Sequence, residues 1–282
     1  MVLEALITPW KARRHPFRLF FLGLLFAIAS VIFSLWVFPN QASMVMVLLL
    51  VMMSVPLMYA TLVVEEETEI KIKEEASILK VHAKTIGFLA LLFLGFIVGF
   101  TLFYVFLPTN VVDVLFSTQH SAIQSVNDNV SGNVLSLGSF FSILGNNLKV
   151  LIFCILFAFF FGAGAIFILS WNASVIATAI GHYIREGIAS VVGSFGWVNL
   201  ASYFHIFAFG FLRYLTHGIF EIVGYFIGGI AGGIISVGLV KHGWKSAEFS
   251  KVLYDGAVLL IIAVIVLIFA GLVEVSITPL LF

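Results

Sequence analysis

The chain has 282 residues, of which 62% are hydrophobic and 10% are charged. Its 14 basic and 14 acidic residues cancel, so the formal net charge does not favour nucleic acid or an acidic substrate as a partner. A mean hydropathy of +1.17 excludes a soluble globular domain and indicates a polytopic membrane protein. The single cysteine, Cys154, excludes an intrachain disulfide and a metal site built from several cysteines.

Residues 1–64 predict a basic N-terminal segment followed by a transmembrane hairpin. Apolar runs near 17–38 and 43–64 are separated only by a few residues around Pro39-Asn40-Gln41, so the two helices must turn tightly. The first run spans about 22 residues and ends without a small-residue cleavage pattern, which favours a retained helix over a signal peptide. Residues 65–85 are rich in Glu and Lys, and we interpret them as a solvated cytoplasmic connector.

Residues 86–282 predict a core of five further spans, which makes the protein an all-α bundle of about seven transmembrane helices. A polar outer loop, 108–136, follows the third span. The segment 188–212 is interrupted by glycine and polar residues, so it forms either one complete span or a re-entrant one. The predicted spans of this core lie near 86–107, 149–170, 188–212, 214–240 and 253–273, with 137–147 at the membrane interface.

The basic residues predict the orientation of this bundle. With seven spans and the N-terminus inside, every lysine and arginine falls on the inner side except Lys149 and Arg213. Because short cytoplasmic loops carry an excess of Lys and Arg, we expect the N-terminus inside and the C-terminus outside.

The sixth predicted span carries ionisable groups at the start of an apolar run. At about 100° per residue, Arg213, His217 and Glu221 share one helix face with several glycines. Charged groups are costly in hydrocarbon, and glycines let another helix backbone approach, so this face predicts an inner wall of the bundle. The glycines expected to pack helices together are Gly162, Gly164, Gly224, Gly228 and Gly232.

The predicted topology brings polar residues from three helices to the outer side. They are Asn146, Asn147, Lys149, Arg213, His217, Glu221 and Glu274. The alternatives for this group are a set of ion pairs that lock the helix ends, a ligand or ion site open to the outside, and a metal site. His217 and Glu221 supply only two metal ligands, and no H-E-x-x-H or G-x-S-x-G pattern occurs. We therefore predict no catalytic residue, no metal and no cofactor.

A second polar group is predicted on the inner side of the membrane. It comprises Asn172, His182, Arg185 and Glu186. These side chains either cap helix ends or contact a cytoplasmic partner, and capping is the interpretation we adopt.

The order of features from Phe140 onward resembles the stage II sporulation protein M family of integral membrane proteins. The resemblance covers residues 86–275 and rests on the twin asparagines after Phe141-Ser-Ile-Leu-Gly, the glycine-bearing helix with Gly162-Ala-Gly164, the Asn172 turn, and His217-Gly-Ile-Phe-Glu221. Family members commonly carry Asn-Gly where this chain has Asn172-Ala173. The resemblance implies five membrane spans with a sizeable outer loop after the first. For the founding members it implies a membrane scaffold that works with cell-wall hydrolases during engulfment.

These observations predict a non-enzymatic, multi-pass protein of the cell membrane. We expect it to be a scaffold or assembly factor that contacts the lipid bilayer and envelope proteins, with homo-oligomer formation left open and no role for nucleic acid. The alternative is a transporter or channel whose outer polar residues form a vestibule. An intramembrane metal-dependent enzyme is the least favoured reading.

Overall fold

The computed structural model describes residues 17–71, 78–130, 137–161, 164–191 and 197–276. Within these ranges the regular structure is helical, with no strand, so the all-α prediction is confirmed. Seven of the helices are long and apolar enough to cross a membrane, as the hydropathy pattern predicts. The basic N-terminal segment lies outside the described residues.

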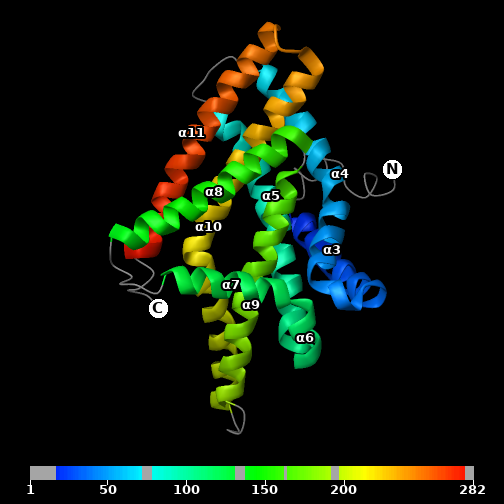
Figure 1. Cartoon of the computed structure of the whole chain (residues 1–282), viewed down its shortest axis with the longest axis vertical. Coiled ribbons are helices and arrows are strands. Elements are labelled where there is room, and N and C mark those ends of the chain that lie inside the picture. The colour runs from blue at the N-terminus through cyan, green and yellow to red at the C-terminus, as the bar shows by residue number, and fades with distance from the viewer. Residues whose placement is uncertain (1–16, 72–77, 131–136, 162–163, 192–196, 277–282) are drawn as a thin grey trace.

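The helices follow one another along the chain with short connections (Figure 1). They are α3 (Phe17–Val37), the 3-10 turn η1 (Pro39–Gln41), α4 (Ala42–Lys71), α5 (Ile78–Phe106), α6 (Thr109–Leu115), α7 (Ser117–Val130), α8 (Leu137–Phe161), α9 (Ala165–Val191), α10 (Trp197–His242) and α11 (Ala247–Ser276). The candidate spans are Phe17–Val37, Pro39–Glu67, His82–Phe106, Gly138–Phe160, Ala165–Ser190, Gly218–His242 and Ala247–Ser276.

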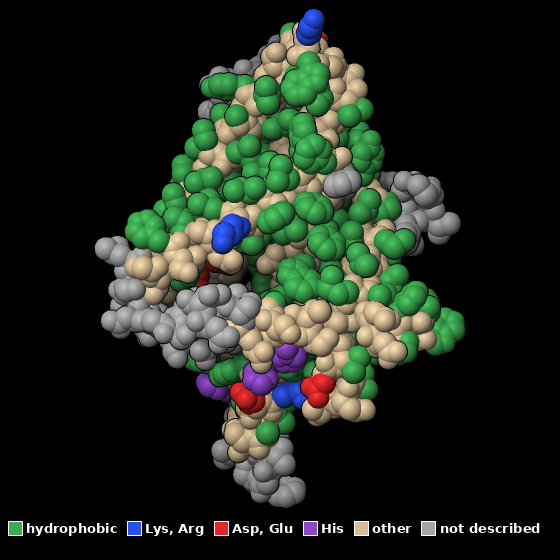
Figure 2. All heavy atoms as spheres, viewed as in Figure 1, with side chains coloured by type: hydrophobic (Ala, Val, Ile, Leu, Met, Phe, Trp, Pro, Cys, Tyr) green, Lys and Arg blue, Asp and Glu red, His purple; other side chains and the backbone are tan. Residues whose placement is uncertain are grey.

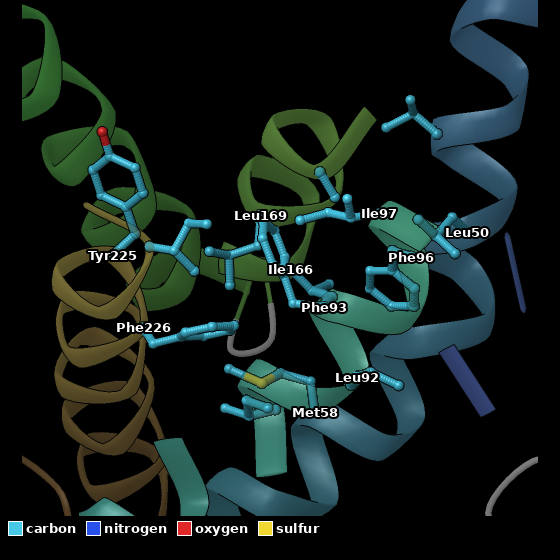
Figure 3. Close-up of a cluster of buried hydrophobic side chains, with 14 of the residues drawn as sticks. Leu50, Met58, Leu92, Phe93, Phe96, Ile97, Ile166, Leu169, Tyr225 and Phe226 are labelled. Carbon is cyan, nitrogen blue, oxygen red and sulfur yellow. The ribbon is translucent and has the colours of Figure 1, made fainter. Parts of the chain in front are cut away.

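Helix α10 is the central helix of the bundle. Its span is 78% buried, a larger share than in the other six spans. Its glycines admit a different neighbour on each side: Gly232 lies against the Ile155 backbone of α8, and Gly224 against Leu267 of α11. Figure 3 shows Phe226 of α10 beside Phe93 of α5, with ring centroids 5.8 Å apart. Inside a bilayer the hydrophobic effect does not drive helices together. Close backbone approach at glycines, which increases van der Waals contact, is therefore the packing mode expected there.

Helix α3 packs on α5 through a pair of facing glycines. A Cβ added at Gly23 would collide with the Leu92 carbonyl oxygen, and one added at Gly95 would collide with the Phe20 carbonyl oxygen. The two backbones are therefore in direct contact, as in small-xxx-small membrane interfaces. The N-terminal hairpin is consequently part of the bundle core.

The fourth and fifth spans differ from the sequence prediction. Helix α8 begins at Leu137, so the segment 137–147 belongs to the fourth span and is not interfacial. The fifth span is Ala165–Ser190, and the prediction of a span within 188–212 is wrong. The chain turns at the junction of α8 and α9, where a Cβ on Gly164 would collide with the Phe157 carbonyl oxygen. Apolar residues continue on both sides of this turn, so hydropathy does not reveal it.

Helix α10 is too long to lie entirely within a bilayer. Its 46 residues extend over about 69 Å at 1.5 Å per residue, whereas the hydrocarbon core is about 30 Å thick. The N-terminal part of α10 pairs with the end of α9, where Gly187 lies against Ile206 and Gly210 against Tyr183. In Figure 1 this pair forms a hairpin that extends below α6 and α7; we call it the α9–α10 hairpin.

Figure 2 shows how apolar and charged side chains are distributed over one face of the bundle. Hydrophobic side chains cover most of the middle of this face, while His, acidic and basic side chains gather near its lower end. A surface that is mostly apolar over its middle and charged near one end is expected of a membrane-spanning bundle.

Candidate functional site

Three helices bring polar side chains together near one end of the spans. The Asn147 Nδ2 of α8 donates a hydrogen bond to Glu221 Oε1 of α10 at 2.5 Å. The Tyr225 hydroxyl, one turn along α10, donates to Asn147 Oδ1 at 2.9 Å. Glu274 of α11 lies near Glu221 and completes the group. We call Asn147, Glu221, Tyr225 and Glu274 the Glu221 cluster.

The local sequence explains how these residues meet. Glu221 and Tyr225 are four residues apart, so they lie on one face of α10. Gly243, with φ of +75°, ends α10 in the left-handed conformation that glycine adopts without strain, and α11 then returns antiparallel along α10. Gly271 of α11 lies against Phe140 of α8, which brings α8 to the same level.

The predicted outer group is thus only partly assembled. Asn147, Glu221 and Glu274 come together, whereas Asn146 and Lys149 are exposed on α8. The side chains of Arg213 and His217 lie outside the described residues. Sequence reasoning missed Tyr225, although its position four residues after Glu221 was a usable signal.

A second polar group closes the opposite end of the bundle, where α4 ends. Glu66 is fully buried; its Oε2 accepts a hydrogen bond from Lys241 Nζ at 2.8 Å, and its Oε1 lies 2.8 Å from His242 Nε2. Glu65, also fully buried, bonds to His82 and to the Thr85 hydroxyl of α5. The prediction that this stretch is simply solvated is therefore wrong at Glu65, Glu66 and His82.

A third group joins α9 to the segment that follows α5. Arg185 donates from Nη1 to the Tyr104 carbonyl oxygen at 3.3 Å and from Nη2 to Thr109 Oγ1 at 3.1 Å. The Tyr104 hydroxyl lies 2.9 Å from His120 Nε2, and the His120 and His182 rings are 6.2 Å apart. Burial, followed by the neighbouring His182, lowers the pKa of His120, which favours its neutral form.

The predicted inner patch is corrected by these contacts. Arg185 binds Thr109, which belongs to the loop 108–136, so this part of α9 and that loop lie at the same end of the bundle. The assignment of one to the inner side and the other to the outer side cannot hold. Asn172 is not part of this group, because its Nδ2 donates to the Ile168 carbonyl oxygen at 2.8 Å within α9. His182 and Glu186 form an exposed i,i+4 pair at 3.2 Å.

The start of α7 is fastened to the bundle through a buried glutamine. Gln119 is fully buried; its Oε1 accepts from Ser43 Oγ at 2.8 Å, and its Nε2 donates to Ser174 Oγ at 3.1 Å. The Ser43 hydroxyl also bonds to that of Thr118. Since buried amides must find partners, this network holds the first half of the predicted outer loop against α4 and α9.

The family Stage II sporulation protein M matches residues 88–279. This chain belongs to that family. No curated protein and no solved structure matched it. The matched range agrees with the sequence resemblance over 86–275, and together with the seven apolar helices it makes the chain a multi-pass membrane protein of this family.

The family match begins inside α5 and ends just after α11, so it contains the whole Glu221 cluster. Helices α3 and α4 lie outside the match, yet both pack on helices within it. Glu66 of α4 pairs with Lys241, and Gly23 of α3 faces Gly95. In this member of the stage II sporulation protein M family, the N-terminal hairpin therefore completes the bundle. Among the described residues, no group of three or more His, Cys, Asp or Glu could hold a metal ion.

Proposed function

We propose that this member of the stage II sporulation protein M family is a non-enzymatic scaffold of the cell membrane, which holds partner proteins of the cell envelope. The observation that carries the proposal is the α9–α10 hairpin, whose α10 arm continues the most buried helix of the bundle ahead of the candidate span that begins at Gly218. A rigid element rooted in the bundle core can present a partner at a constant distance and angle.

The packing of α10 supports a static role. Gly233 lies against Leu62 of α4, and Gly229 against Ala165 of α9, so the faces that could have lined a path contact other helices. The polar ends are tied as well, through Glu66 with Lys241 and through Asn147 with Glu221. These contacts on several sides hold the central helix in place.

The hairpin also carries exposed apolar side chains suited to protein contact. Phe204 is 76% exposed and Leu212 is 59% exposed. Aromatic side chains, including Phe, are enriched at the buried core of protein interfaces. The α9–α10 hairpin is therefore the surface on which we expect an envelope partner, or a second copy of the chain, to bind.

Site-specific photocrosslinking in native membranes tests this proposal. A photoreactive residue in place of Phe204 should give one defined protein adduct. The same residue in place of Ile261, which is 61% exposed on the α11 span, should give lipid adducts only. If position 204 yields no protein adduct, the scaffold proposal loses its main support.

The second candidate, a transporter or channel, is favoured by one specific observation. Two carboxyl groups, Glu221 and Glu274, lie together within the spans, and intramembrane acids commonly mark ion paths. Flux of a solute or ion into liposomes that is lost in Glu221→Ala would favour this candidate over the scaffold.

A further inference from the structure

Helix α7 is attached to the bundle by side chains of different chemistry at consecutive positions. Thr118 and Gln119 bind through hydroxyl and amide groups, which do not titrate near neutral pH. The next residue, His120, lies with its Nε2 2.9 Å from the Tyr104 hydroxyl of α5. Histidine changes its charge between about pH 5 and pH 8, so this contact is the one on which a change of pH acts.

The surroundings of His120 disfavour a positive charge on its ring. The ring of His182 in α9 lies 6.2 Å away, nearly perpendicular to it. Arg185 of the same helix lies with Cζ 6.0 Å from the centre of the Tyr104 ring and binds the Tyr104 carbonyl oxygen. A proton on His120 therefore adds a positive charge beside a guanidinium and a second histidine.

The acids near His120 are exposed to water. Helix α7 packs on α9, α4 and α6. On α9, Glu186 is 70% exposed and 3.2 Å from His182, and on α6, Asp113 is exposed. Residues 42–55 of α4 include no titratable side chain, and on α7 itself the next charged residue is Asp128, whose side chain lies outside the described residues. Interactions of exposed charges are weakened by water, so these acids only partly offset the positive groups.

We infer that His120 is a pH-dependent latch that holds α7 on the end of the bundle. In the neutral ring Nε2 can accept the hydrogen bond from Tyr104, and α7 stays against α5 and α9. In the protonated ring both nitrogens are donors, and the new charge faces Arg185 and His182. Beyond Gln119, which stays bound, α7 then moves away from α9.

The direction of the pH effect follows from the pKa of His120. Burial, and after it His182, lowers this pKa while α7 is attached, against a smaller opposing effect of Asp113. The released state, with His120 in water, has the ordinary histidine pKa of about 6.5 and binds a proton more readily. The attached state therefore loses stability relative to the released state as the pH falls below about 6.5.

The latch lies where it can respond to the surroundings of the cell. In the orientation that the basic residues predict, this end of the bundle faces outside. In Figure 1, α7 crosses α9 where the α9–α10 hairpin begins. The inference does not depend on the scaffold proposal, because release of α7 is compatible with either candidate function.

Distance measurement between spin labels in the full-length protein tests the latch. The labels are placed at Gln124→Cys on α7 and Met44→Cys on α4, both exposed, with Cys154 replaced by alanine, in phosphatidylcholine nanodiscs. The distance distribution should be narrow at pH 8 and become longer or broader at pH 5, with a midpoint below about pH 6.5.

Histidine variants assign the transition to His120. With His120→Gln, whose amide can still bond to Tyr104 but cannot gain a proton, the distribution should stay the same from pH 8 to pH 5. His182→Gln should lower the midpoint, because it removes a group that becomes positive. His205→Gln, at an exposed histidine of α10, is the matched control and should leave the midpoint unchanged.

Hydrogen–deuterium exchange of the wild-type protein decides the question if the variants fail to fold. Relative to the intrinsic amide rate at each pH, peptides of α7 should exchange faster at pH 5 than at pH 8, while peptides of the α10 span should not. Exchange in α7 and a label distance that are both independent of pH overturn the latch. A transition that persists in His120→Gln also overturns it.

Discussion

Adjacent residues on a helix diverge by about 100°, and Glu65 and Glu66 use this divergence to bind different helices. Glu65 contacts His82 and Thr85 of α5, and Glu66 contacts the end of α10. Sequence reasoning treated this run as solvated because charge runs usually are. Glu65 and Glu66 are buried because α5 and the end of α10 lie beside them. A sequence pattern does not show which helices will lie beside a given residue.

Replacement of the buried acid is expected to destabilise the bundle. Glu66→Gln leaves Lys241 without its buried counter-charge, and removal of one partner of a buried ion pair costs about 3–5 kcal/mol. Lys241 is 34% exposed, so we expect a smaller loss of about 1–3 kcal/mol. Glu67→Gln is the control, because Glu67 is 56% exposed and 3.4 Å from Lys241; it should cost less than about 1 kcal/mol. Equal losses for the two variants, measured by denaturant unfolding in micelles, would refute this reading.

At the scale of elements, the helix contacts depend on glycines whose role is visible only from their neighbours. The glycines of α10 were noted in the sequence, and Gly224 and Gly232 lie against other helices. Gly23 and Gly95 form an equally close contact and were missed, because single glycines in separate apolar helices do not reveal that they face each other. Gly87 on α5 shows the opposite case, with no atom within 4 Å of an added Cβ.

The same substitution at two glycines should therefore have opposite effects. Gly23→Ala forces α3 away from the Leu92 backbone, and overpacking of this kind costs about 1–3 kcal/mol or more. Gly87→Ala places a methyl group in open space and should be neutral or stabilising by up to about 1 kcal/mol, since alanine is the better helix former. Thermal unfolding of both variants in the same detergent measures the difference. A Gly23→Ala protein as stable as the wild type would show that α3 and α5 are not in backbone contact.

At the scale of the whole molecule, the position of α9 as a span determines which polar groups lie on the same side of the membrane. Because α9 is the fifth span, its end carrying Arg185 meets Thr109 at the end opposite the α10–α11 turn. The distribution of lysine and arginine residues predicts that Lys245 lies on the cytoplasmic side of the membrane. Arg185 then lies on the outer side of the membrane, as Lys149 and Arg213 do. The remaining basic residues still predict that the N-terminus lies inside.

Thiol labelling of intact cells checks this arrangement. With Cys154 replaced by alanine, a membrane-impermeant maleimide should label Ser121→Cys and Glu186→Cys, and should label Lys245→Cys only after the cells are opened. All three positions are exposed. Labelling of Ser121→Cys and Glu186→Cys from opposite sides would contradict the assignment of α9 as a span. Labelling of Lys245→Cys in intact cells would invert the predicted orientation.

The sequence by itself determined the class of the protein, its family, seven apolar helices, and the polar face of α10 that carries Glu221. These properties depend on segment length, apolar content and residues close together in the chain. Only the tertiary structure decided where α8 ends, which acids are buried, and that Asn147 bonds to both Glu221 and Tyr225. The physical reason is that an apolar run has the same hydropathy whether or not it turns at Gly164, and a polar side chain in a membrane bundle is stabilised by whichever helix lies beside it.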